Sequence, residues 1–114
     1  MRIIETSVRN GCLRIACAGP FGVGSEGNPS GHLLKRTLET ALDAPDPGIN
    51  EVVIDFTEVE YEWGDGPAWA VWPAFRRNLK VRYVARGTAG KSLAELFRVT
   101  GFAPTWDIQV DEAD

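Results

Sequence analysis

The feature that most constrains the fold is a short apolar run in the middle of the chain, Val52-Val53-Ile54. It lacks the polar alternation of a strand with one solvated face and is typical of a strand that is covered on both faces. We therefore predict that residues 51–56 form the central strand of a sheet flanked by helices.

Two β-rich runs precede this strand, residues 1–7 and 12–18, and they are joined by Arg9-Asn10-Gly11. Asn-Gly favours the positive φ angles of a tight turn, so the sequence predicts an opening β-hairpin. Cys12 and Cys17 lie five residues apart and would point to opposite faces of one strand. We expect two buried thiols with no disulfide between them.

Helical periodicity appears in two segments. Residues 30–43 carry Leu34, Leu38, Ala41 and Leu42 at helical spacing, and the Pro-rich segment 44–48 ends this helix. The preceding residues 19–31 are rich in Gly, Pro, Ser and Asn and predict a loop. A second helix is predicted over residues 91–100, where the apolar stripe is followed by Gly101.

The remaining elements are strands at residues 79–85 and 106–110, the last at the edge, and a difficult segment at 67–78. In that segment Ala68, Trp72 and Phe75 are helically spaced, but Pro73 removes an internal hydrogen bond, so we expect a broken or shortened helix.

The order of these elements is hairpin, helix, strand, helix, strand, helix, strand. Crossovers of this kind require a partly parallel sheet. The fold class predicted is therefore α/β, with a mixed, largely parallel sheet of four to five strands that opens with a β-hairpin and is flanked by helices. A chain of 114 residues has the size of one domain, so we expect a single domain over residues 1–114.

Two segments carry a resemblance to a known family. In residues 52–66, Asp55, Val59, Tyr61 and Gly66 match a buried strand ending in Asp, an apolar loop and a glycine at a helix start. Residues 96–102 end in a Thr-Gly-aromatic turn. Together with the order of elements over nearly the whole chain, these segments resemble the STAS family, the anti-sigma-factor-antagonist-like domains.

The resemblance implies a regulatory module that docks onto an anti-sigma factor kinase or assembles into signalling complexes. The partner-binding residues would be Trp63, Gly64, Asp65, Gly66 and Trp69. In the family, phosphorylation of a serine at the helix start releases the partner, but the matched positions here, Gly64 and Asp65, have no hydroxyl group. Asp65 carries a permanent charge smaller than that of phosphoserine, so it would either hold the domain in a state resembling the phosphorylated one or cap the helix, and we favour the cap.

The aromatic residues around this position divide into two groups. Trp72 and Phe75 share a helical stripe, which predicts that they are core, whereas Trp63 and Trp69 are the better surface candidates for contact with a partner.

We predict no catalytic residue. Glu58, Glu60, Glu62 and Asp65 are interpreted as a solvated loop, and His32 as an ordinary surface residue.

A rival interpretation places a ligand on residues 85–92, which resemble a relaxed phosphate-binding loop between a strand and a helix. Its candidate anion-binding residues are Gly87, Thr88, Gly90, Lys91 and Ser92. An enzyme of this kind needs a second acidic strand for its magnesium ion, and only one short strand follows. A small-ligand or nucleotide-binding domain, and a structural subunit that assembles with copies of itself, remain the alternatives.

Charge and composition restrict the partners further. The net charge is −4, and Lys and Arg are scattered, so we expect no nucleic-acid partner. No apolar run is long enough to span a bilayer and residues 1–10 do not resemble a signal peptide, so we expect a cytoplasmic protein with no membrane partner. With one histidine and no close cysteine pair, we expect no metal site and no cofactor.

Overall fold

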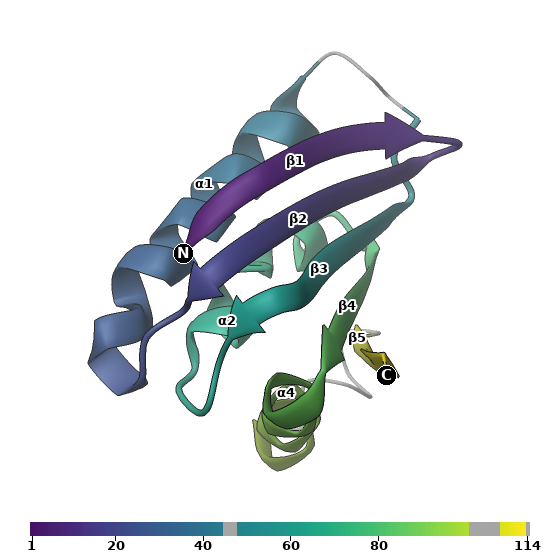
Figure 1. Ribbon diagram of the computed structural model, residues 1–114. Coiled ribbons are helices and arrows are strands. Elements are labelled where there is room, and N and C mark those ends of the chain that lie inside the picture. Colours follow the sequence, from purple (N-terminus) through teal and green to yellow (C-terminus); the bar gives the residue numbers. More distant parts are fainter. Residues whose placement is uncertain (45–47, 101–107, 114) are drawn as a thin grey trace.

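A computed structural model describes residues 1–44, 48–100 and 108–113. The strands are β1 (Arg2–Arg9), β2 (Cys12–Pro20), β3 (Glu51–Glu60), β4 (Lys80–Arg86) and β5 (Ile108–Ala113). They form a five-stranded sheet in the order β1-β2-β3-β4-β5 (Figure 1). β1 and β2 are antiparallel, and each later pair of neighbours is parallel. The predicted mixed, largely parallel sheet is confirmed, with β3 as its central strand.

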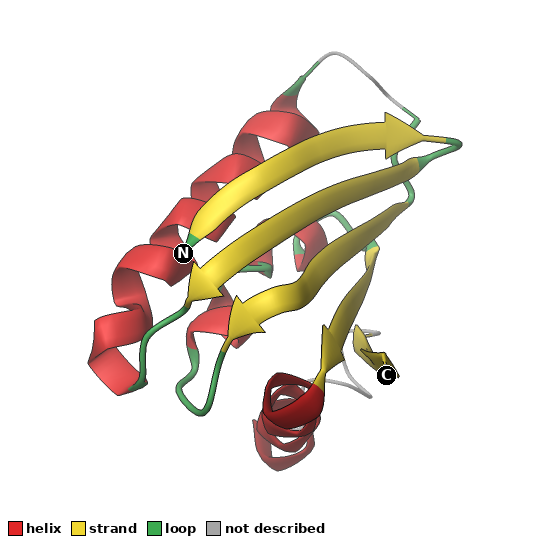
Figure 2. Ribbon diagram, viewed as in Figure 1, coloured by secondary structure: helices red, strands yellow, loops and turns green. Residues whose placement is uncertain are grey.

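The helices follow the strands in the predicted alternation. A short 3-10 helix, η1 (Gly24–Gly27), leads into α1 (Asn28–Asp43), and α2 (Gly66–Trp69), α3 (Trp72–Phe75) and α4 (Gly87–Thr100) follow later. Each crossover leads to the next strand in the same direction, and such connections are right-handed, so the helices gather on one side of the sheet. In Figure 2 the face of β1, β2 and β3 that is turned toward the viewer carries no described helix.

The opening hairpin turns at Asn10 and Gly11, with φ angles of 51° and 80°. Both residues therefore occupy the left-handed region that Asn-Gly favours, as the sequence predicts. Cys12 and Cys17 are free thiols. Cys17 is buried as expected, but Cys12 is only half-buried, because it begins β2 beside the exposed end of the hairpin.

The core lies between the sheet and the helices. Alternate residues of β2, β3 and β4 point into it and meet the apolar stripes of α1 and α4; the largest of these buried side chains are Leu13, Ile15, Leu34, Leu38, Ile54, Phe56, Tyr83, Leu93 and Phe97. The Tyr83 ring packs on those of Phe56 and Phe97, with centroids 5.0 and 5.6 Å apart. The sheet and α4 are thereby joined by aromatic contacts.

Val53 departs from the expectation of a strand covered by layers on both sides. It is 6% exposed but does not belong to the core cluster that faces the helices. Its register partners are Arg14 on β2 and Arg82 on β4. Long arginine stems cover apolar surface while their charged ends stay in water. Among the described residues, Val53 is thus buried by neighbouring side chains in its own sheet.

Several boundaries differ from the predicted ones. The predicted loop at residues 19–31 is shorter, because β2 continues to Pro20 and α1 begins at Asn28, with Pro29 in a first turn that tolerates proline. α4 begins at Gly87 rather than at residue 91. β3 continues to Glu60 because Val59 is still buried beside exposed Glu58 and Glu60.

The segment after β3 is broken as predicted, into α2 and α3, each of which has a proline in its first turn. The break overturns one expectation: Phe75 is buried, but Trp72 is 46% exposed. The expected shared stripe requires one continuous helix, and Val71, with φ −94° and ψ 8°, interrupts it.

The predicted last strand at 106–110 is observed from residue 108; residues 45–47, 101–107 and 114 lie outside the described part of the chain.

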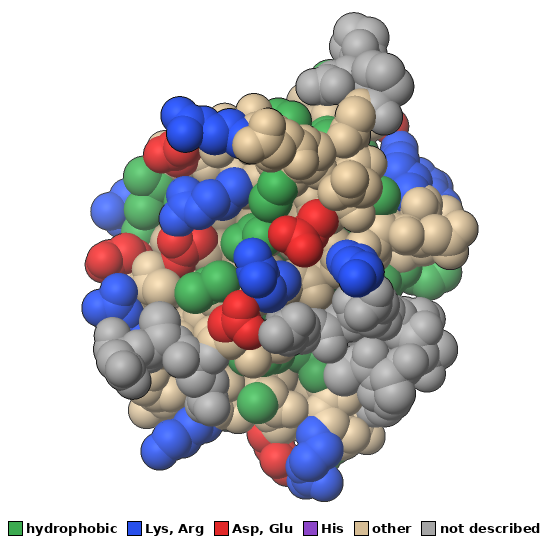
Figure 3. All heavy atoms as spheres, turned by 90° about the vertical axis from the view of Figure 1, so that its right-hand side faces the viewer, with side chains coloured by type: hydrophobic (Ala, Val, Ile, Leu, Met, Phe, Trp, Pro, Cys, Tyr) green, Lys and Arg blue, Asp and Glu red, His purple; other side chains and the backbone are tan. Residues whose placement is uncertain are grey.

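The described surface mixes the two signs of charge. In the view of Figure 3, Lys and Arg side chains are interspersed with Asp and Glu. On the sheet, Arg14 pairs with Asp55, and Arg82 lies 3.7 Å from Glu51 and 3.5 Å from Asp111. Within the described ranges, no helix is long and apolar enough to cross a membrane.

Candidate functional site

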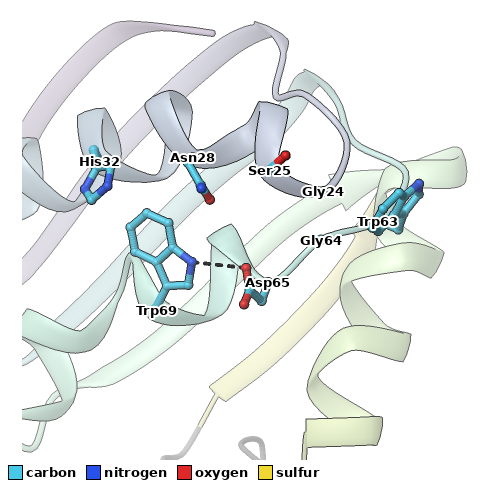
Figure 4. A pocket seen from close by; sticks show the side chains of 8 residues that line it. All are labelled: Gly24, Ser25, Asn28, His32, Trp63, Gly64, Asp65 and Trp69. Carbon is cyan, nitrogen blue, oxygen red and sulfur yellow. Dashed lines mark hydrogen bonds between the residues drawn. The ribbon is translucent and has the colours of Figure 1, made fainter.

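A hollow of about 720 Å³ lies beside the carboxyl ends of β2 and β3. One wall is formed by η1 and α1, and the other by the segment that leads from β3 into α2 (Figure 4). Its lining residues are Gly24, Ser25, Asn28, His32, Trp63, Gly64, Asp65 and Trp69. The two segments that follow neighbouring parallel strands thus meet at one edge of the sheet, where parallel α/β folds commonly bind ligands.

Four of the five predicted partner-binding residues line this hollow: Trp63, Gly64, Asp65 and Trp69. The fifth, Gly66, is buried and does not line it. A Cβ atom at Gly66 would lie 2.7 Å from Cε1 of Phe21, so a side chain there would displace that ring. Gly66 therefore allows α2 to approach the core.

Trp63 stands at one end of the hollow and is 61% exposed. Its ring rests on Gly24, where an added Cβ atom would lie 2.7 Å from Cη2 of the indole. The amide of Gly24 donates a hydrogen bond of 3.3 Å to the carbonyl oxygen of Trp63. Gly64, with φ 125°, adopts a conformation that side chains rarely permit. Gly24 therefore leaves room for this exposed indole, and Gly64 lets the two walls approach each other closely.

Asp65 occupies the N-cap position of α2, as favoured from the sequence, but its carboxylate does not cap the helix. The amides of Ala68 and Trp69 donate instead to the backbone carbonyl of Asp65. The carboxylate Oδ1 accepts a hydrogen bond of 3.2 Å from Nε1 of Trp69 (Figure 4). The expected capping role is wrong because this side chain turns toward the indole four residues later.

Trp69 forms the other end of the hollow and is packed from α1. A Cβ atom at Gly31 would lie 2.5 Å from Cη2 of Trp69, so the absence of a side chain there makes room for the ring. The His32 ring lies 4.8 Å from Trp69 between centroids, at an interplanar angle of 50°. The interpretation of His32 as an ordinary surface residue is thus incomplete. His32 lies four residues after Asn28, so the two side chains share one face of α1, and this spacing was the sequence signal that both could line the hollow.

Two buried tyrosines anchor this wall. The Tyr61 hydroxyl donates a hydrogen bond of 2.5 Å to the carbonyl oxygen of Gly64, and the Tyr83 hydroxyl donates one of 2.7 Å to that of Pro67. Burial, together with the charge of Asp65, raises the pKa of Tyr61 to about 12. Both phenols therefore remain protonated donors near neutral pH.

The candidate anion-binding segment takes a different form from the predicted loop. Residues 87–92 are the first residues of α4, and Gly87, with φ 59°, turns β4 directly into that helix. Lys91 and Ser92 line a separate, largely apolar groove with Trp63, Leu96 and Val99. Gly90 is buried, and Thr88 lines another hollow beside Arg86. These residues do not form one concave surface.

The fold and site define the class of protein: an α/β domain with a five-stranded mixed sheet and an aromatic hollow at the carboxyl edge of its parallel strands. Comparisons with models of known families, with curated proteins and with solved structures return no match for this chain. Within the described ranges, no three His, Cys, Asp or Glu side chains gather as metal ligands.

Proposed function

We propose that this chain is a non-catalytic regulatory module of the STAS type that docks a protein partner through the surface around Trp63. The observation that carries the proposal is an exposed indole that packs on Gly24 beside a hollow. Exposed aromatic anchors next to pockets are typical hot spots of protein interfaces. Because the amide of Gly24 and the hydroxyl of Tyr61 bond to the backbone of this loop, binding should cost little backbone entropy there.

The proposal is compatible with the fold, an α/β sheet that opens with a hairpin. Asp65 lies exposed at the start of α2, where the family carries its phosphorylated serine. A carboxylate at this position cannot be phosphorylated by a kinase acting on hydroxyl groups. We therefore propose docking without a phosphorylation switch, in a cytoplasmic setting where thiols such as Cys12 and Cys17 stay reduced.

The interaction of the two walls also favours docking over catalysis. The Asp65 carboxylate accepts a hydrogen bond from Trp69, and the His32 ring packs at a tilt against the same indole. These contacts fix the shape of the hollow and engage the carboxylate and the imidazole with protein groups, which suits docking better than catalysis. The nucleotide-binding alternative has less support, because residues 87–92 are helical from Gly87 onward and do not form a phosphate-binding loop.

The test is affinity capture from a lysate of the source cells with the wild-type domain and two variants. Trp63→Ala removes the proposed anchor, whereas Trp72→Ala removes another exposed indole that does not line the hollow. We expect a regulatory protein such as an anti-sigma factor kinase to be captured by wild type and Trp72→Ala and lost with Trp63→Ala. The purified pair should then show a Kd raised at least about tenfold by Trp63→Ala alone.

The second part of the test measures the oligomeric state of the purified domain by light scattering. A fixed oligomer that dissociates on Trp63→Ala would identify a second copy of this chain as the partner. Capture that is equal for wild type and both variants, with no Trp63-dependent oligomer, would overturn docking through this surface.

A further inference from the structure

We propose that the hollow between Trp63 and Trp69 recognises an arginine side chain of the docked partner. This inference rests on the docking function proposed above and names the chemistry that the site selects. It follows from the charge of the hollow, its hydrogen-bond acceptors and its aromatic walls.

The charge of the hollow favours a cation. Its lining includes one carboxylate, that of Asp65, and no lysine or arginine. A second, smaller cavity is lined by Glu26 from η1 and by Glu60 and Glu62 at and just after the end of β3, and these last two also line a hollow with Arg86. Carboxylates from two separate segments therefore meet in that second cavity. Lys91 lies in the apolar groove that shares Trp63 and Gly64 with the hollow. Among Asp, Glu, Lys and Arg, only Asp65 lines the hollow itself, so the fixed charge at this site attracts a cation.

The acceptors match a guanidinium group. Asp65 uses Oδ1 for the indole of Trp69, and a carboxylate offers about four lone-pair sites, so it can accept further hydrogen bonds. Asn28 projects from α1 toward the gap between Trp69 and Asp65 (Figure 4), and Ser25 lies on the same wall. Both side chains carry an acceptor oxygen. A guanidinium has five N–H donors in a plane and can bond to acceptors on both walls at once.

The aromatic walls distinguish an organic cation from a metal ion. Trp63 and Trp69 stand at opposite ends, with Asp65 between them (Figure 4). Indole faces attract cations through the ring quadrupole, and arginine also stacks on them as a plane. Divalent ions are usually held by several carboxylates, whereas this lining offers one carboxylate beside the neutral oxygens of Ser25 and Asn28. A volume of about 720 Å³ also accommodates residues that flank the arginine.

The test uses the isotope-labelled full chain and three small probes in NMR titrations: N-acetyl-arginine amide, the lysine analogue and the citrulline analogue. Citrulline has nearly the shape of arginine without its charge. We expect the arginine probe to shift the indole N–H signals of Trp63 and Trp69 and the amides of Asn28 and Asp65. The lysine probe should bind at least about threefold more weakly, and citrulline should cause no shift at these positions.

Two variants test whether the charge of Asp65 is responsible for binding of the arginine probe. Asp65→Asn keeps the side-chain shape but removes the charge, and should weaken the arginine probe about tenfold or more. Glu5→Gln removes a carboxylate from β1, outside the lining, and should leave the affinity unchanged. Equal binding of citrulline, equal binding of lysine, undiminished binding to Asp65→Asn, or shifts confined to other surfaces would each overturn the proposal.

The two proposals fail separately. If a partner is captured in a Trp63-dependent manner but the arginine probe does not bind, docking stands and arginine recognition is wrong. If the probe binds as expected but nothing depends on Trp63 in capture or self-association, the hollow is a cation site, and docking of a partner through it is wrong.

Discussion

The hydroxyl of Tyr61 donates a hydrogen bond of 2.5 Å to the carbonyl oxygen of Gly64, which ties the buried residue directly after β3 to the loop that carries Trp63. Gly64 itself has φ 125°, so its carbonyl points where few other residues would direct it. A core residue thus determines the position of the most exposed indole of the hollow.

Tyr61→Phe tests this relationship. Loss of the hydroxyl leaves the Gly64 carbonyl without this donor and should lower the free energy of unfolding by about 1 kcal/mol. The loop should also loosen, and the indole N–H signal of Trp63 should broaden or shift in NMR spectra. Tyr83→Phe is the matched control, since it removes the hydrogen bond to Pro67 and should cost similar stability with little effect on Trp63. An unchanged Trp63 signal in Tyr61→Phe would contradict the anchoring role.

Asp55 should control part of the acid sensitivity. Burial acts to raise its pKa, but hydrogen bonds from the hydroxyl and amide of Thr57 and the charge of Arg14 outweigh burial and hold the pKa below its ordinary value. The resulting stabilisation is fully present above the unfolded-state pKa of about 3.9 and is lost as pH falls through the folded-state pKa. In denaturant unfolding at a series of pH values, Asp55→Asn should lose less stability below about pH 4 than wild type does. Thr57→Val should lie between the two, and identical pH profiles would refute the assignment.

The two thiols should differ in reactivity. Burial, with a smaller effect of the Asp55 charge, raises the pKa of Cys17 to about 12, and its side chain is 1% exposed. Cys12 is half-buried, and its pKa is raised by burial and by Glu51. At about pH 8, where ordinary thiols are partly ionised, a colorimetric thiol reagent should label Cys12 slowly and Cys17 only after unfolding. Cys12→Ser should abolish labelling of the folded chain; rapid labelling of that variant would show that Cys17 is accessible.

Gly31→Ala should have the opposite sign from an ordinary helix substitution. Alanine in place of glycine within a helix usually stabilises by about 0.5–1 kcal/mol. Here the new methyl group would lie 2.5 Å from Cη2 of Trp69, a ring that Asp65 and His32 hold in place. We expect a lower melting temperature and a displaced Trp69 indole signal. Adding Trp69→Phe, which shortens the ring system, should recover part of the loss; a stabilised single variant would mean that Trp69 moves aside freely.

The sequence predicted the fold well where local signals and packing agreed. Asn10-Gly11 predicted the hairpin, the leucine spacing predicted α1, and the apolar run at residues 52–54 predicted the central strand. It was less informative where a contact comes from another element. The burial of Val53 depends on Arg14 and Arg82 from neighbouring strands, which no local pattern reports.

The candidate site shows the same limit. Trp63 and Trp69 were identifiable as surface candidates, but the opposite wall from η1 and α1 was not, because residues 24–32 are brought to α2 only by the crossover from β2 to β3. The orientation of Asp65 also required the structure, since N-cap preference describes backbone position and the side chain instead bonds to Trp69.

The agreement between strand order in space and strand order along the chain has a consequence for how the molecule forms. Each strand after β1 pairs with the strand immediately before it, and no strand inserts between two earlier ones. During synthesis from the N-terminus, the edge that receives each new strand already exists when that strand emerges. The sheet can therefore grow in one direction, and each step closes only the connection between two strands that are consecutive in the chain, so no pairing has to span an intervening strand.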